Sequence, residues 1–203
     1  MVTLPTRSRE GYAAMFATFL AKNGSDFIVT DIVRTIFMII DLWQYEEGTW
    51  PGLMIIIDFA NINIGYLAAA DLPTMRHFFY FLEEALLVKM KGLHIVNAPP
   101  FMDRVMALIR PMVKNLDVIQ IHSGFKELDK IYPIEALPKD VGGNYMSIED
   151  CKVLMKEKLR ANANYFEAES LKRVCESRRP GKPKTVTDFF GGVEGSFKKL
   201  DID

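Results

Sequence analysis

The sequence has few cysteines and no excess of charge of either sign. Cys151 and Cys175 are the only two cysteines in 203 residues, which is too few for a disulfide framework, and they lack the spacing of a zinc site. Lys and Arg number 25 and Asp and Glu number 26, so the basic excess of a nucleic-acid-binding protein is missing. We therefore expect reduced thiols, no metal site and no nucleic-acid partner.

The sequence also lacks a long apolar run. A membrane-spanning helix needs about 20 consecutive apolar residues, and the most apolar stretch, residues 52–70, is interrupted by Asp58, Asn61 and Asn63. The first ten residues are polar and contain no apolar core of a signal peptide. Hydrophobic residues nevertheless make up 49% of the chain, including 11 Met and 14 Phe. This apolar material must lie inside a folded domain.

Apolar strands alternate with amphipathic helices along the first 160 residues. The patterns predict strands at 12–21, 53–59, 93–97 and 118–122, and helices at 28–47, 71–90, 100–113 and 147–160. The segment LMIIIDF, residues 53–59, is apolar on both faces, which is typical of a parallel sheet covered by helices. We therefore predict an α/β fold with a mainly parallel β-sheet flanked by helices.

The motifs of nucleotide binding and covalent catalysis are missing. No G-x-G-x-x-G follows a strand, and neither a Walker loop nor a nucleophile elbow occurs. We expect His94 to be a hydrogen-bonded histidine of the core and Asp58 to accept hydrogen bonds from the turn after its strand. An acid–base pair of these two residues would instead indicate an enzyme. His77 and His122 have no further ligand at metal-binding spacing, so we predict a non-enzymatic protein.

The predicted helix at 100–113 is apolar over more than half of its circumference and contains three methionines. Methionine is flexible and suits a surface that adapts to a partner or ligand, although a core helix would show the same pattern. Lys89, Lys91, Arg110 and Lys114 lie in or beside this helix. Such a basic cluster fits an anionic membrane surface or a phosphoinositide headgroup, and ordinary solvated charge is the alternative.

Four segments of the chain resemble the CRAL-TRIO, or Sec14-like, lipid-binding domain. They are GLMIIIDF from Gly52, KMKGLHIVNAPPFMDRVMALIRPMV from Lys89, VIQIHSG from Val118 and LPKDVGGN from Leu137. The resemblance covers about residues 10 to 165 and is closest to insect proteins related to α-tocopherol transfer protein and cellular retinaldehyde-binding protein. It implies a lipid-binding domain at 1–165, without the helical N-terminal domain of the family. A basic linker and a C-terminal extension ending in GGVEGSFKKLDID then occupy 166–203.

The resemblance further implies an apolar ligand cavity between sheet and helices, closed by residues 100–113 as a gate helix. A hydrophobic small molecule or lipid is the expected ligand, with no other cofactor. The ligand-binding positions that it implies are Val33, Ile36, Phe37, Ile40, Ile56, Phe78, Phe81, Leu82, Leu86, Met90, Leu93, Phe101, Val105, Ile109 and Met112.

In tocopherol-type members, basic residues beside the gate contact a phosphoinositide. Lys89, Lys91 and Lys114 fall on three such positions, Val118 occupies the fourth, and Arg110 is the candidate to compensate. The resemblance thus implies a cytoplasmic protein, peripheral at membranes, that transfers a tocopherol-, retinoid- or phospholipid-like molecule. The alternative is a membrane-tethering interaction module in which phenylalanines such as Phe37 fill the cavity and no ligand is transferred. The sequence leaves the ligand and the oligomeric state open.

Overall fold

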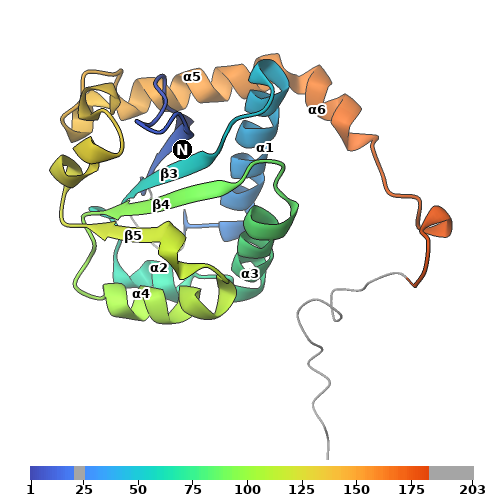
Figure 1. Ribbon diagram of the computed structural model, residues 1–203, viewed down its shortest axis with the longest axis horizontal. Helices are drawn as coiled ribbons and strands as arrows, with labels where there is room; N and C mark the ends of the chain where they lie inside the picture. Colours follow the sequence, from blue (N-terminus) through green and yellow to red (C-terminus); the bar gives the residue numbers. More distant parts are fainter. Residues whose placement is uncertain (21–25, 183–203) are drawn as a thin grey trace, which may run out of the picture. The chain divides into compact units, whose positions relative to one another are not determined.

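The computed structural model describes residues 1–20 and 26–182 (Figure 1). The tail GGVEGSFKKLDID lies outside the described residues. Compact packing divides the chain into one unit at Met1–Ala163 and a second at Asn164–Asp203. The strands of the first unit are β1 (Val2–Thr3), β2 (Ala13–Thr18), β3 (Leu53–Asp58), β4 (Met90–Val96) and β5 (Ile119–His122).

These strands form a five-stranded sheet in the order β1-β2-β3-β4-β5. Strands β2 to β5 are parallel, and β1 is an antiparallel strand at the edge. The predicted α/β fold with a mainly parallel sheet is confirmed. One row across the sheet contains Met15, Ile55, Leu93 and Ile119 as paired neighbours. Because successive strand residues point to opposite faces, the next row, which contains Ile56, faces the other side.

The helices cover the sheet and its edges. In the first unit they are α1 (Val29–Glu47), α2 (Ile64–Ala68), α3 (Leu72–Tyr80), the π-helix η2 (Phe81–Ala85), α4 (Met102–Ile109) and α5 (Ile148–Ala161). Short 3₁₀ turns are η3 (Arg110–Met112), η4 (Leu116–Val118), η5 (Phe125–Lys130), η6 (Ile134–Ala136) and η7 (Lys139–Val141). The last elements are α6 (Ala163–Ser170) and η8 (Glu176–Arg178). In Figure 1, α5 crosses the top of the first unit, whereas α2 and α4 lie along the bottom.

The helix predicted at 71–90 is shorter than expected. Asp71 caps α3 by accepting a hydrogen bond from the backbone N–H of Thr74. Helix α3 continues into η2, where the N–H of Leu86 donates to the carbonyl of Phe81 and closes a wide turn. Leu86 is extended, residues 87 and 88 form bends, and Met90 already pairs with Leu53 in the sheet. The prediction of helix up to residue 90 was wrong because the wide turn of η2 ends the helix at Ala85.

The helix predicted at 100–113 is also shorter. Helix α4 ends at Ile109, and Arg110 opens the 3₁₀ turn η3. Pro111 has no backbone N–H, so it cannot continue the hydrogen-bond pattern of an α-helix. The short elements β1 and α2 were not predicted from the sequence.

The sheet face that carries Ile56 is tightly packed. Phe125 of η5 contacts Phe16 of β2, with 6.4 Å between the ring centroids. Leu128, Tyr132 and Leu137 are completely buried in the same core cluster. This face therefore holds a conventional hydrophobic core, and any large ligand must bind elsewhere.

Two histidines share a hydrogen bond on this packed face. Nδ1 of His94 lies 3.0 Å from Nε2 of His122, and both side chains are buried. Nδ1 of His122 lies 3.6 Å from a carboxylate oxygen of Glu127. Burial, reinforced by the neighbouring His122, lowers the pKa of His94 from 6.5 to about 4. The prediction of a hydrogen-bonded core histidine is confirmed.

Asp58 also has the structural role that the sequence predicted. Its Oδ1 accepts hydrogen bonds from the backbone N–H of Ala60 and from the side-chain amide of Asn97, at 3.0 and 2.9 Å. Asn97 has a positive φ of 55°, which this contact supports. Asp58 thus fixes the turns that follow β3 and β4.

We expect Ile56→Ala to destabilise the protein by about 2–5 kcal/mol, because Ile56 is completely buried at the centre of β3. Ile121→Ala makes the same chemical change at a half-exposed position of β5, and its effect should stay within about 0.5 kcal/mol. Urea unfolding followed by circular dichroism measures both. Equal losses in the two variants would contradict the packing described here.

We expect stability to fall as the pH decreases from about 6.5 to about 4. The unfolded chain binds a proton at His94 in this window, whereas the folded chain does not, so protonation favours unfolding. The full loss corresponds to about 3 kcal/mol. Urea unfolding between these pH values should show a smaller pH dependence for His94→Gln. His77→Gln, at an exposed position, is the control and should keep the original dependence. An unchanged slope in His94→Gln would refute the assignment.

Candidate ligand-binding cavity

An apolar cavity of about 680 Å³ lies on the sheet face opposite the histidine pair. Its floor consists of Ile55 and Ile57 of β3, Leu93 and Ile95 of β4, and Ile119 of β5. These residues alternate along their strands and stand beside each other across the sheet. The parallel register therefore presents a continuous aliphatic floor.

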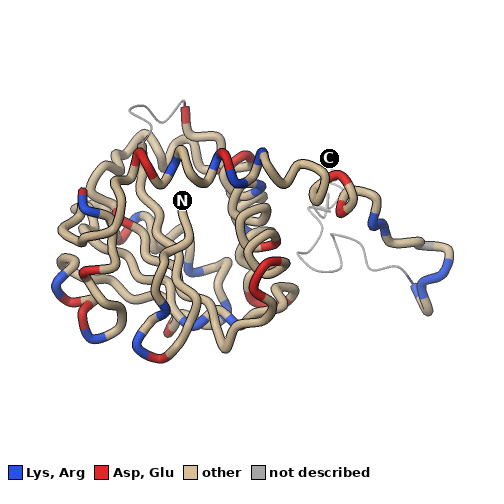
Figure 2. The backbone as a smooth tube through the Cα atoms, turned by 90° about the horizontal axis from the view of Figure 1, so that it is seen from above, with Lys and Arg blue, Asp and Glu red and all other residues tan. Residues whose placement is uncertain are grey.

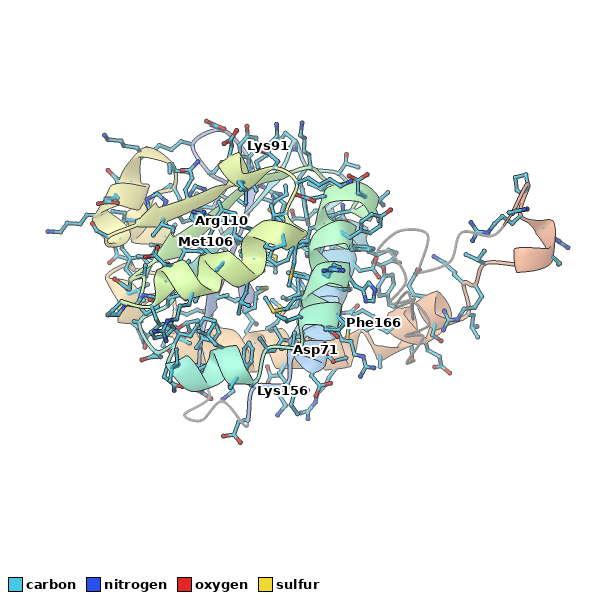
Figure 3. All side chains as sticks on the ribbon, turned by 90° about the horizontal axis from the view of Figure 1, so that it is seen from below. Asp71, Lys91, Met106, Arg110, Lys156 and Phe166 are labelled. Atoms are coloured by element: carbon cyan, nitrogen blue, oxygen red, sulfur yellow. The ribbon has the colours of Figure 1, made fainter. Side chains whose placement is uncertain are left out.

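Three helices form the walls of the cavity. Four residues of α1 at helical spacing, three residues of α3 and three residues of α4 line it: Val29, Ile32, Val33, Ile36, Met75, Phe78, Phe79, Val105, Leu108 and Ile109. Figure 3 shows Met106 on the same helix α4. Its side chain packs against a second group of buried residues, which includes Phe59, Phe79 and Val113. Helix α4 therefore contributes one face to the cavity. Its role as a gate stays a prediction.

Nine of the fifteen predicted ligand-binding residues line this cavity. They are Val33, Ile36, Phe78, Leu82, Leu86, Met90, Leu93, Val105 and Ile109. The other six do not line it: Phe37, Ile40, Ile56, Phe81, Phe101 and Met112. Whether any of these residues binds a ligand stays a prediction.

Orientation explains these six positions. Ile56 points to the packed face of the sheet, since its strand neighbours Ile55 and Ile57 face the cavity. Ile40 is buried in the main core. Phe37 packs on Phe81 with 4.4 Å between the ring centroids, so these two rings support the wall from behind. Phe101 precedes α4 and Met112 follows it, outside the stretch of α4 that lines the cavity.

Aromatic rings close one end of the cavity. Phe19 and Phe27 each contact Tyr66, with centroids 5.1 and 4.8 Å apart, and Phe19 also contacts Phe59 at 5.2 Å. All four residues line the cavity. The sequence analysis missed this group because the rings come from three separate segments. The floor residues Ile55, Ile57 and Ile95 were also missed, although the period of two along a strand could have paired them with Leu93.

Charged residues gather where the cavity meets the amino ends of β4 and β5. Glu83, Glu84, Lys89, Lys114 and Asn115 line this region, which we call the charged mouth. Because parallel strands start at the same edge of a sheet, the segments before β4 and β5 lie together here. Leu87, which is 88% exposed, lies at the charged mouth as well.

The carboxylates of the charged mouth hold the segment that follows α4. Glu83 accepts hydrogen bonds from the backbone N–H groups of Lys114 and Asn115, at 2.9 and 3.3 Å. The ammonium group of Lys114 lies 2.7 Å from a carboxylate oxygen of Glu84, and this hydrogen bond raises the pKa of Lys114. The π-helix η2 is thus tied to the segment that follows η3, and the ammonium group of Lys114 has a carboxylate partner.

The four predicted phosphoinositide-binding residues occupy different places. Lys89 and Lys114 lie at the charged mouth. Lys91 is the extra residue where the β3–β4 register shifts, and its ammonium group lies 5.5 Å from the ring centroid of Tyr12. Arg110 is exposed at the end of α4, and Figure 3 shows it on that helix while Lys91 comes from β4. Within residues 1–20 and 26–182, neither Lys89, Lys91 nor Arg110 forms an ion pair.

The described part of the chain offers little else for chemistry. The polar partner of His94 is His122, and that of Asp58 is Asn97, so these two residues form no acid–base pair. No group of three His, Cys, Asp or Glu side chains among the described residues is arranged to hold a metal ion. None of the helices at these positions has the length and apolarity needed to cross a bilayer.

Comparisons with known proteins agree with this architecture. Residues 1–143 match the model of the CRAL/TRIO domain. The human protein "Alpha-tocopherol transfer protein-like" is 23% identical over 123 residues, which is 59% of this chain and 36% of that protein. Clavesin-1 of Xenopus laevis is 23% identical over 133 residues, 64% of this chain and 40% of that protein.

The chain therefore spans well under half the length of these relatives. Among solved structures, "Crystal structure of Sfh5" superposes with a TM-score of 0.42 and 12% identity, covering 78% of this chain and 64% of that one. Because the family model covers most of the chain, the chain belongs to the CRAL/TRIO domain family.

Proposed function

We propose that this CRAL/TRIO domain binds one hydrophobic small molecule or lipid and transfers it between membranes without catalysing a reaction. The observation that carries the proposal is the cavity of about 680 Å³, whose floor and walls are almost entirely aliphatic and aromatic. Burial of apolar surface stabilises a bound ligand by about 25 cal/mol per Å². A tocopherol-, retinoid- or phospholipid-like molecule fits this chemistry.

The volume of the cavity favours a carrier over a membrane-tethering module of the same fold. In the tethering alternative, Phe37, Phe78 and Phe81 would fill the space. Instead, Phe37 packs on Phe78 and Phe81 behind the wall, and only Phe78 faces the cavity. Transfer of a fluorescent lipid between donor and acceptor vesicles distinguishes the two functions, since a tether binds vesicles without moving lipid.

Membrane docking at the charged mouth is the second part of the proposal. Lys89, Lys91 and Arg110 form no ion pair within the described residues and can contact a phosphoinositide headgroup. Lys114 must first exchange Glu84 for the headgroup phosphate. Leu87 offers an exposed apolar side chain beside these cations. The protein would then act in the cytoplasm and at membrane surfaces.

We expect solvent extraction of the purified protein, followed by mass spectrometry, to recover one hydrophobic compound. An absorbance spectrum separates retinoids and carotenoids from other lipids. Val33→Trp should reduce uptake of a fluorescent hydrophobic probe by about fivefold to 100-fold, since overpacking a filled site costs about 1–3 kcal/mol.

Val153→Trp is the matched control for the cavity experiment, because Val153 is a half-exposed residue of α5 outside the cavity. Its probe uptake should equal that of the unmodified protein. A protein that is empty on purification and takes up no probe would contradict the proposed carrier function.

We expect Lys89→Ala combined with Lys91→Ala to weaken binding to phosphoinositide-containing vesicles, and the difference should shrink at high salt because the attraction is electrostatic. The control variant, Lys126→Ala with Lys130→Ala, removes two exposed lysines of η5 and should bind as before. Equal binding of both variants at low salt would show that the charged mouth does not recognise the headgroup.

A further inference from the structure

We propose that residues 171–182, which we call the basic segment, form a second membrane-binding site that recognises anionic lipid. The basic segment belongs to the second unit of the chain and lies outside the cavity lining. The site therefore acts on the bilayer surface and needs no bound ligand.

Positive charge is concentrated in the basic segment. Five cations, Lys172, Arg173, Arg178, Arg179 and Lys182, stand against one Glu within twelve residues, although the whole chain has a net charge of −1. All five cationic side chains are exposed. Lys172 pairs with Glu169 of α6, which offsets part of its charge. Figure 2 shows Lys and Arg recurring along the chain before the grey terminus.

Exposed aliphatic residues lie among these cations. Leu171 is 79% exposed and Val174 is 71% exposed. Cations beside accessible aliphatic side chains match the two layers of a membrane interface, where phosphates lie above the first acyl carbons. The segment contains no aromatic residue. Since single-stranded nucleic acid is held largely by stacking on aromatic rings, the composition favours a lipid surface.

The charged mouth alone provides little long-range attraction to an anionic bilayer. Its two lysines, Lys89 and Lys114, share this region with two carboxylates, those of Glu83 and Glu84. The mouth is therefore close to neutral as a whole and attracts an anionic bilayer weakly from a distance. The basic segment has five cationic residues and one Glu, so it supplies the positive electrostatic field that the charged mouth lacks.

The test is flotation with vesicles of phosphatidylcholine alone and of phosphatidylcholine mixed with phosphatidylserine. The basic-segment variant carries Arg173→Gln, Arg178→Gln, Arg179→Gln and Lys182→Gln. Each Lys or Arg near an anionic surface strengthens binding roughly fivefold, so we expect at least a tenfold loss on the phosphatidylserine vesicles. Binding to phosphatidylcholine alone should be equal for both proteins.

The matched control carries Lys126→Gln, Lys130→Gln, Lys156→Gln and Arg160→Gln, which removes the same charge from exposed positions of η5 and α5. It should keep most of the binding to phosphatidylserine vesicles. Equal losses in the two variants would overturn the proposal, because net charge alone would then explain binding. Retained binding in the basic-segment variant would overturn it as well.

Two further measurements separate this proposal from others. Uptake of the hydrophobic probe should be unchanged in the basic-segment variant, so a failed carrier function and a failed membrane site give different results. Binding of a single-stranded RNA oligonucleotide that depends on the basic segment, without any effect of the segment on vesicle binding, would show that nucleic acid is the true partner.

Discussion

The alternation of side chains across four parallel strands is the constraint on which the rest of the structure depends. A strand such as Ile55–Ile56–Ile57 places apolar groups on both faces, so both faces must be kept from water. The 3₁₀ segment η5 and the turns after it fill one face with Phe125, Leu128 and Tyr132. The other face meets α1, α3 and α4, which leave a cavity between them.

The cavity persists because its walls are supported from outside. Phe37 of α1 and Phe81 of η2 pack on each other outside the cavity, and the rings of Phe19, Phe27, Phe59 and Tyr66 close one end of it. Aromatic rings are rigid and bury large areas, so they keep the helices apart without entering the space. An apolar ligand then adds the contacts that the floor and walls lack, which is the physical basis of the proposed binding.

The sequence predicted the fold better than it predicted the cavity. Short β-branched runs such as LMIIIDF favour buried strands, and their alternation with amphipathic helices predicts the parallel α/β sheet. The same runs conceal which face each residue takes, because Ile55, Ile56 and Ile57 are equally apolar. A shift of one residue exchanges the faces, so Ile56 and Ile55 could be assigned only from the register. The end of the helix was mispredicted for a different reason, since the apolar residues Leu86, Leu87 and Val88 continue the helical pattern beyond the turn where η2 ends it.

The carboxylates of the charged mouth bear on the proposed membrane docking. Charges are costly to remove from water unless they are paired. Glu83 and Glu84 pair with the backbone and side chain of Lys114, so the mouth carries its own counter-charges. Under the proposed function, a headgroup phosphate would offer Lys114 an equivalent partner, and the exchange would remove one of the contacts that hold the segment after α4. Closure and docking would then compete for one ammonium group.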